Sequence, residues 1–165
     1  MNGKVENMIL LLLFFYILLI PFFILLHEIG HGMGAAFSSS SHVHIYLGAK
    51  NEENKEKFKV GKFHFHIIWS YIGFACWEIK LNKRQRAIAI AGGPLMSLLL
   101  ALLFGWLTIV TSQSQLHLLF WWSTLFNFLQ FVATIIPVKY PRWMGGYSGY
   151  RSDGLQLLRI LKDKG

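Results

Sequence analysis

An apolar run from Met8 to Leu26 leads directly into the sequence His27-Glu28-Ile29-Gly30-His31. Residues four positions apart lie on one face of a helix, so His27 and His31 can offer two imidazoles to one metal ion. Glu28 lies one residue further round, where its carboxylate can reach a water at the metal without becoming a ligand. Ionisable residues at the end of a membrane helix are costly and indicate a functional site. The stretch therefore predicts the metal site of a zinc hydrolase, which needs a third ligand from elsewhere in the chain.

Three apolar segments are long enough to cross a hydrocarbon core of ~30 Å. They cover residues 8–37, 87–110 and 116–136. With 165 residues, 54% of them hydrophobic, the chain is too apolar for an ordinary soluble domain and too short for two sizeable ones. We therefore predict a single domain over residues 1–165, a polytopic α-helical membrane protein with three transmembrane core helices. The one cysteine, Cys76, excludes an intrachain disulfide.

The positive charge is concentrated on one side of these segments. The net charge is +8, and of the 16 Lys and Arg residues only Lys4 lies outside residues 38–86 and 138–165. The positive-inside rule places those two regions in the cytoplasm and the N-terminus outside. The basic excess is then a topology signal and an attraction to anionic lipid, and it does not indicate nucleic-acid binding. We predict a multi-pass protein of the cell membrane with its active site near the cytoplasmic side and a cytoplasmic C-terminus.

The first two segments carry features that predict how they bend and pack. Pro21 lacks a backbone N–H, so we expect it to kink the first helix and to free the carbonyl near Ile17. Gly93 and Ser97 form a small-xxx-small pair in the second segment, which predicts close packing against another helix. The first segment has a similar surface after its histidine motif, made of Gly30, Gly32, Gly34, Ala35 and Ala36.

Residues 42–76 change from a helical to an alternating pattern, which is typical of strands. Histidines alternate with apolar residues in 42–47 and again in 62–67, and a polar turn segment around Asn54 separates the two. We expect a small cytoplasmic β-hairpin or sheet in which the strands fold back about Asn54. His42 then faces His66, His44 faces His64, and the segment from Trp69 to Trp77 supplies a third strand or an interfacial anchor. The histidines form either a wet polar face or a second metal or pH-sensing site.

The third metal ligand must come from the cytoplasmic side. His117 begins the third segment at the opposite face, ~30 Å away, and is excluded. The candidates left are the histidines of residues 42–66, Glu78, Asp153 and Asp163. Asp153 begins an amphipathic helix predicted over about residues 153–163, for which Ser152 is the candidate N-cap. Asp153 is therefore either the third metal ligand or a residue that stabilises the start of this helix. Its neighbour Gly154 allows a close backbone approach.

Three motifs together give the chain a resemblance to a known family. The first is His27-Glu28-x-x-His31 at the end of the first core helix, and the second is Gly92-Gly93-Pro94 at the entry to the next. The third is Thr134-x-x-Pro137 followed by Asp153-Gly154. Over most of its length the chain resembles the site-2 protease family of intramembrane zinc metalloproteases, in a compact bacterial form. Thr134 stands where that family commonly has Asn, and the spacing from Pro137 to Asp153 is longer.

The resemblance implies the roles of particular residues. His27, His31 and Asp153 would hold one catalytic Zn²⁺, and Glu28 would be the catalytic acid–base. Strands between the first two core helices would pair with an unwound segment of a transmembrane substrate protein. Residues expected near the substrate are Gly93, Pro94, Asn127, Thr134 and Pro137.

The sequence therefore predicts an intramembrane zinc endopeptidase that cleaves a peptide bond within or near a transmembrane segment of its substrate. Its partners would be that substrate and the lipid bilayer, and no nucleic acid. Two alternatives keep the same fold. One is a membrane metal sensor or carrier that uses the histidines of residues 42–66, and the other is a non-catalytic scaffold.

Overall fold

The computed structural model describes residues 2–162, and its longest element is a helix in three parts. Helix α1 spans Asn2–Phe14, a π-helical turn η1 spans Phe15–Leu19, and α2 spans Ile20–Ser38. Pro21 cannot donate to the carbonyl of Ile17, and that carbonyl instead accepts a hydrogen bond of 2.7 Å from the indole nitrogen of Trp69. The predicted free carbonyl is thus confirmed, and its partner comes from a loop of the sheet region.

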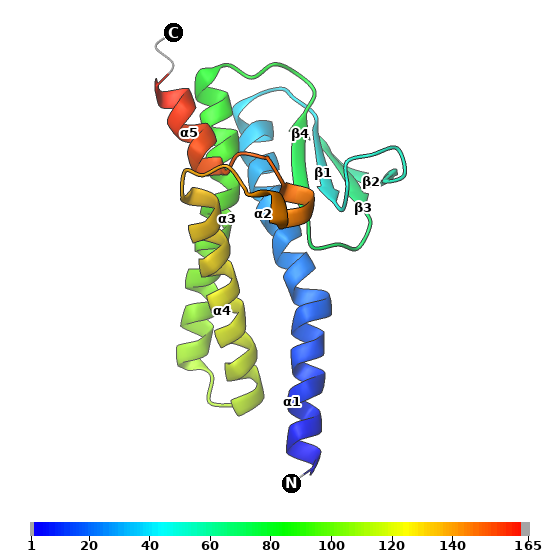
Figure 1. The fold of residues 1–165 in the computed structure, drawn as a ribbon, viewed down its shortest axis with the longest axis vertical. Coiled ribbons are helices and arrows are strands. Elements are labelled where there is room, and N and C mark those ends of the chain that lie inside the picture. Colours follow the sequence, from blue (N-terminus) through cyan, green and yellow to red (C-terminus); the bar gives the residue numbers. More distant parts are fainter. Residues whose placement is uncertain (1, 163–165) are drawn as a thin grey trace.

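Two further helices run side by side as an antiparallel pair (Figure 1). They are α3, Lys83–Val110, and α4, Ser114–Ile135. Asn82 begins α3 through a capping box with Gln85, with bonds of 2.9 and 3.0 Å. Among the described residues, three helices are long and apolar enough to cross a membrane, namely Gly3–Ser38, Lys83–Val110 and Ser114–Ile135. These helices match the three predicted segments closely at their ends. The first begins at Gly3 rather than residue 8, and the second begins at Lys83 rather than residue 87, so each is about one turn longer than predicted.

Small residues bring α2 and α3 close together, as predicted. A Cβ on Gly30 would collide with the carbonyl of Gly92, and one on Gly34 would lie 2.5 Å from the carbonyl of Ile88. Gly32 differs from the prediction, because it faces the sheet rather than α3: a Cβ at this position would lie 3.1–3.3 Å from Ile45, Val43 and Phe63. The half of α2 that follows Pro21 is therefore enclosed by α3 on one side and by the sheet on another.

The sheet stands beside α2 (Figure 1). Its strands are β1, Val43–Leu47, β2, Glu56–Val60, β3, Phe63–Ile67, and β4, Gly73–Trp77, in the order β2-β3-β1-β4. Alternate residues of β1 are fully buried in the core next to α2, and these are Val43, Ile45 and Leu47. Because side chains alternate between the two faces of a strand, the histidines of β1 and β3 lie on the opposite, outer face.

The predicted direction of the histidine segments is wrong, and one of the two predicted pairs is confirmed. We expected residues 42–47 and 62–67 to form an antiparallel hairpin, but β1 and β3 are parallel, with His44 opposite His64 as predicted and with Tyr46, not His42, opposite His66. The antiparallel hairpin is formed by β2 and β3 instead. The reason is that the intervening chain contains a strand of its own, so it returns to the starting end of β1. The predicted third strand near Trp77 is present as β4.

The last segment connects α4 to a short helix across α2 (Figure 1). It contains a 3₁₀ segment, η2 (Arg142–Tyr147), and ends in α5, Asp153–Lys162. The Ser152 hydroxyl accepts from the Leu155 N–H at 3.2 Å, so Ser152 caps α5 as predicted. Gly154 touches the Ile135 carbonyl at the end of α4 so closely that a Cβ could not be accommodated. Asp163, at the predicted end of this helix, lies outside the described residues.

Candidate metal centre

The histidine motif lies in the enclosed half of α2 and is almost completely buried. The exposed fractions are 3% for His27, 7% for Glu28 and 7% for His31. Buried ionisable side chains are unfavourable unless they are paired or bind an ion, so these three residues need partners. The partners of the two histidines come from α3 and from the start of α5.

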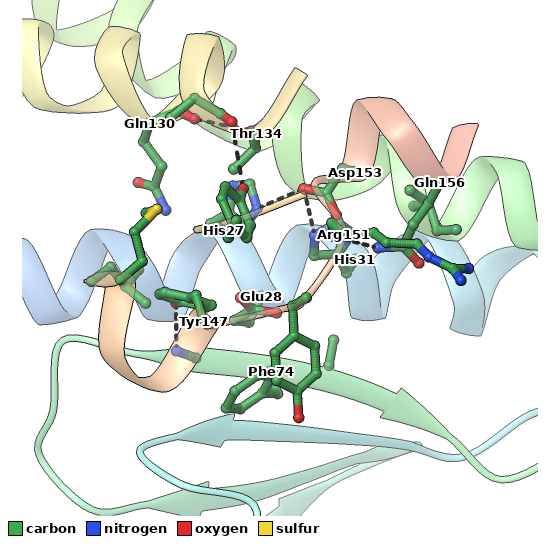
Figure 2. Close-up of a pocket in the computed structure, with 18 of the residues that line it drawn as sticks. His27, Glu28, His31, Phe74, Gln130, Thr134, Tyr147, Arg151, Asp153 and Gln156 are labelled. Carbon is green, nitrogen blue, oxygen red and sulfur yellow. Dashed lines mark hydrogen bonds and ion pairs between the residues drawn. The ribbon is translucent and has the colours of Figure 1, made fainter. Parts of the chain in front are cut away.

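Asp153 supplies the third member of the group (Figure 2). Its Oδ2 atom lies 3.4 Å from Nε2 of His27 and 3.4 Å from Nε2 of His31. Ligand atoms around a tetrahedral zinc ion at ~2.0–2.1 Å are separated by ~3.3–3.4 Å. The observed separations from Asp153 therefore need almost no adjustment to hold an ion, and the three residues form a group that could hold a metal.

The outward-facing ring nitrogens of both histidines are anchored to α3. Nδ1 of His31 lies 2.9 Å from the Ala89 carbonyl, which can only accept, so we place a proton on Nδ1 and leave Nε2 to face Asp153, where a metal ion would take the place of its proton. A contact of 3.3 Å between the Gly93 N–H and the same Nδ1 is then not a hydrogen bond. Nδ1 of His27 lies 2.8 Å from the Ser97 hydroxyl. Partners of this kind fix the tautomer and orientation of metal-binding imidazoles.

The start of α5 directs Asp153 toward the histidines. Ser152, not Asp153, caps the helix, so the Asp153 carboxylate remains free to face the imidazoles. Burial alone raises the pKa of Asp153, but the charge of His31 and hydrogen bonds from His27 and His31 outweigh it and hold the pKa at about 2. Asp153 is therefore an anion at physiological pH, which is the form that binds metals.

Within the described residues 2–162, the structure brings none of the other candidate ligands into this group. Glu78 lies 3.0 Å from Nε2 of His44 on the outer face of the sheet. His117 is in the first turn of α4, far along the molecule from the motif (Figure 1). Of the candidates within residues 2–162, Asp153 alone joins His27 and His31.

Glu28 faces a large cavity next to the histidines. The cavity has a volume of about 650 Å³ and is bounded by α2, β4, α4 and the segment before α5. A Cβ on Gly73, at the start of β4, would lie 2.7 Å from Cγ of Glu28, so only a glycine fits against this carboxylate. Glu28 and the three residues that could hold a metal ion thus line one cavity.

The five residues expected near a substrate fall in different places. Thr134 lines the cavity, and Gly93 packs directly against the His31 ring. Pro94 is fully buried in α3. Asn127 is also fully buried, with its amide nitrogen 2.8 Å from the Ser123 carbonyl, and Pro137 is exposed; neither belongs to the described lining of the cavity.

Sequence reasoning missed several polar residues of the cavity. Gln130 on α4 lines it, and its Oε1 is buried without a hydrogen-bond partner among the described residues. The available signal was a polar amide in an apolar helix, one turn before Thr134.

Two tyrosines of the loop before α5 also line the cavity. Tyr147 accepts a 2.8 Å hydrogen bond from the Gly73 N–H. Burial raises the pKa of Tyr140 to about 12 and also raises that of Tyr147, so both phenols remain protonated. No spacing rule connects these loop tyrosines to the motif.

Fold and site together define a helical protein that has three helices able to cross a membrane and a buried His-His-Asp group able to hold a metal ion. Comparisons with protein-family models, with curated proteins and with solved structures found no match to this chain.

Proposed function

We propose that this protein is an intramembrane zinc endopeptidase, which cleaves a peptide bond within or near a transmembrane segment of its substrate. The observation that carries the proposal is the arrangement of Asp153 at 3.4 Å from both imidazoles, with Glu28 beside them in the same cavity. Two imidazoles and one carboxylate are the ligands of many catalytic zinc sites, in which a fourth position stays open. A structural zinc site would use a closed set of four protein ligands.

Each residue of the centre has a distinct task in this proposal. His27, His31 and Asp153 would hold the ion. A bound zinc would act as a Lewis acid, which polarises the substrate carbonyl and lowers the pKa of the attacking water. Glu28 accepts the proton of the attacking water on its carboxylate and passes it to the leaving amide nitrogen. The protonated phenols of Tyr140 and Tyr147 are hydrogen-bond donors in the same cavity.

The edge of the sheet offers a way to hold the substrate. All five residues of β4 line the cavity, and β4 pairs on one side with β1. A transmembrane helix hides its backbone from attack, so it must unwind before cleavage, and an unwound segment can add to a free strand edge. The Gly73 N–H, which now donates to Tyr147, is one of the groups available to such a segment.

The membrane setting supports a substrate that is itself in the bilayer. The motif belongs to a helix able to cross a membrane, and large apolar side chains cover its exposed surface, including Leu10 at 64% and Phe37 at 77% exposed. We propose that the protein lies in the cell membrane with the centre near the cytoplasmic side, because 15 of the 16 Lys and Arg residues lie in the regions next to that end.

Replacing Glu28 by Gln tests the proposal. Gln is nearly isosteric but cannot accept a proton, so cleavage should fall ~10²–10⁴-fold while zinc content and fold are kept. The assay co-expresses the protein with a panel of single-span reporters tagged at both ends and detects products on a gel. Glu6→Gln, an exposed position on the same long helix, is the matched control and should cleave normally.

Two results would contradict the proposal. Cleavage by Glu28→Gln at the unmodified rate would remove Glu28 from the mechanism. A protein that binds zinc at His27 and His31 but cuts none of the reporters would favour a metal sensor or carrier, for which Glu28 has no task. The specific observation on the side of that second function is the additional histidine cluster on the sheet.

A further inference from the structure

Four histidines gather on the outer face of the sheet, on the side away from α2. Nδ1 of His42 lies 3.1 Å from Nε2 of His64, and Nδ1 of His44 lies 3.0 Å from Nε2 of His66. The rings of His44 and His64 stack at a centroid distance of 4.6 Å. We call His42, His44, His64 and His66 the sheet cluster.

Two carboxylates complete the sheet cluster from outside. Glu56 on β2 lies 2.8 Å from Nδ1 of His64, and Glu78 lies 3.0 Å from Nε2 of His44. Carboxylates at the surface are ionised at neutral pH, and both of these can accept from the imidazoles that they contact. Two negative charges therefore face four imidazoles.

His44 contacts both an imidazole and a carboxylate. Its Nδ1 lies 3.0 Å from Nε2 of His66, whose Nδ1 donates to the Asn54 carbonyl at 2.9 Å, and its Nε2 lies 3.0 Å from Glu78. The network therefore consists of imidazole nitrogens and carboxylate oxygens, the two kinds of atom that bind transition-metal ions.

We propose that His44, His64 and Glu56 form a second site for a divalent transition-metal ion, separate from the centre on α2. One ligand atom from each of the three lies within 4.8 Å of the others. Contraction to the ~3.3–3.4 Å of a tetrahedral site requires shifts of ~1.5 Å or less at each pair of atoms. Glu78 supplies the second negative charge that neutralises a dication.

The donor set and the exposure define the kind of ion. Imidazole and carboxylate together suit Zn²⁺, Ni²⁺ and Cu²⁺ rather than Ca²⁺ or Mg²⁺, which take oxygen ligands. The His44 and His64 side chains are 25% and 13% exposed, and those of Glu78 and Glu56 are 50% and 41% exposed. An ion can therefore reach the sheet cluster directly from water, without entering the cavity of the α2 centre.

Zinc stoichiometry of the full-length protein tests the proposal. Protein purified in detergent and stripped of metal by a chelator is titrated with Zn²⁺ by calorimetry, and bound metal is counted after dialysis. The unmodified protein should bind two ions, His44→Asn/His64→Asn one, and His27→Asn/Asp153→Asn one. The combined variant should bind none. His117→Asn, a lone histidine on α4, should still bind two.

Finer variants and a spectroscopic readout make the test independent of folding. Glu56→Gln should weaken the second Zn²⁺ by at least the ~10–100-fold that loss of a ligand's supporting partner costs, and Glu52→Gln in the neighbouring turn should not. In the His27→Asn/Asp153→Asn background, Co²⁺ should give saturable visible absorption bands from the intact sheet cluster. Absence of these bands, or two bound zinc ions in His44→Asn/His64→Asn, would overturn the proposal. Because each centre is removed separately, a failure of the α2 centre is distinguished from a failure of the sheet cluster.

Discussion

His27 and His31 lie one helical turn apart on α2, whereas His44 and His64 lie opposite each other on the parallel strands β1 and β3. In the α2 centre each imidazole uses Nδ1 for a partner in α3 and turns Nε2 toward Asp153. In the sheet cluster most of the bonded ring nitrogens contact one another or exposed carboxylates, and Nδ1 of His66 contacts the Asn54 carbonyl. In the α2 centre, a partner in α3 fixes each ring through the nitrogen that faces away from Asp153. In the sheet cluster, the nitrogens that would bind an ion are themselves used for the contacts that fix the rings.

This difference predicts different binding behaviour. Burial and fixed partners set the geometry of the α2 centre before any ion arrives, so little has to be reorganised on binding. The sheet cluster must exchange hydrogen bonds and protons for the ion, which lowers its affinity and makes it depend more steeply on pH. We therefore expect the α2 centre to be the tighter of the two sites.

The largest expected effect concerns the proposed topology, in which both centres lie on the cytoplasmic side of the membrane. In a Cys76→Ser background, Lys55→Cys, in the turn before β2, should react with a membrane-impermeant thiol reagent only after cells are opened. Ser114→Cys, at the start of α4, should react in intact cells. The opposite pattern would place both histidine centres outside the cytoplasm and would end the proposed topology.

A glycine substitution should remove metal from one centre only. A Cβ at Gly93 would collide with the His31 ring, so Gly93→Ala should displace the ring and cost about 1–3 kcal/mol of stability. We expect zinc to be lost from the α2 centre and kept in the sheet cluster. Gly105→Ala on the same helix is the control, since its nearest contact would be an ordinary 3.6 Å to Thr124. Unchanged zinc binding in Gly93→Ala would show that His31 does not depend on this packing.

Removal of the hydroxyl behind His27 should have a smaller effect. Ser97→Ala leaves Nδ1 of His27 without its 2.8 Å partner, so zinc affinity at the α2 centre should fall ~10–100-fold. Thr108→Ala on the same helix removes a hydroxyl that bonds only its own helix, at the Phe104 carbonyl, and should leave the affinity unchanged. Calorimetry in the His44→Asn/His64→Asn background isolates this centre. Equal zinc affinities for the two variants would show that Ser97 does not orient the His27 imidazole.

The smallest expected effect is at the cap that precedes Asp153. Ser152→Ala should cost ~0.5–2 kcal/mol in thermal unfolding and should weaken zinc binding only at the α2 centre, because Asp153 loses its fixed starting point. Ser148→Ala, at an exposed position of the same loop, should change neither quantity. A stable Ser152→Ala protein with normal zinc affinity would mean that contacts of α5 alone place Asp153.

The helical features could be predicted because their signals are local. Three long apolar segments, the freed carbonyl at Ile17 and the shared face of His27 and His31 follow from composition, proline chemistry and the helical repeat. Asp153 is distant in the sequence, and its choice among the candidates depended on the resemblance to a family. The structure places it beside both histidines.

The sheet was harder because alternation determines a strand's face but not its direction. The same pattern in residues 42–47 and 62–67 fits antiparallel and parallel pairing equally, with the histidines on one side in both cases. Strand β2 was missed because all five of its residues are exposed, so no buried face marks Glu56–Val60 as a strand. Gln130 and the loop tyrosines reach the cavity through tertiary packing that local sequence does not encode.

The Ser152 hydroxyl joins the two ends of the long loop between α4 and α5. Oγ of Ser152 donates to the Ile136 carbonyl at 2.6 Å and accepts from the Val138 N–H at 3.0 Å. Beside it, the backbones of Lys139 and Arg151 pair as an isolated antiparallel β-bridge. The stretch from 138 to 151 is therefore an Ω-shaped loop whose two ends meet at its base. Loops of this kind tolerate insertions and deletions, because a change of length at the tip does not move the base. Asp153, which follows the loop, can keep its position while the tip, which carries Met144 and Tyr147 into the cavity, varies in length or sequence.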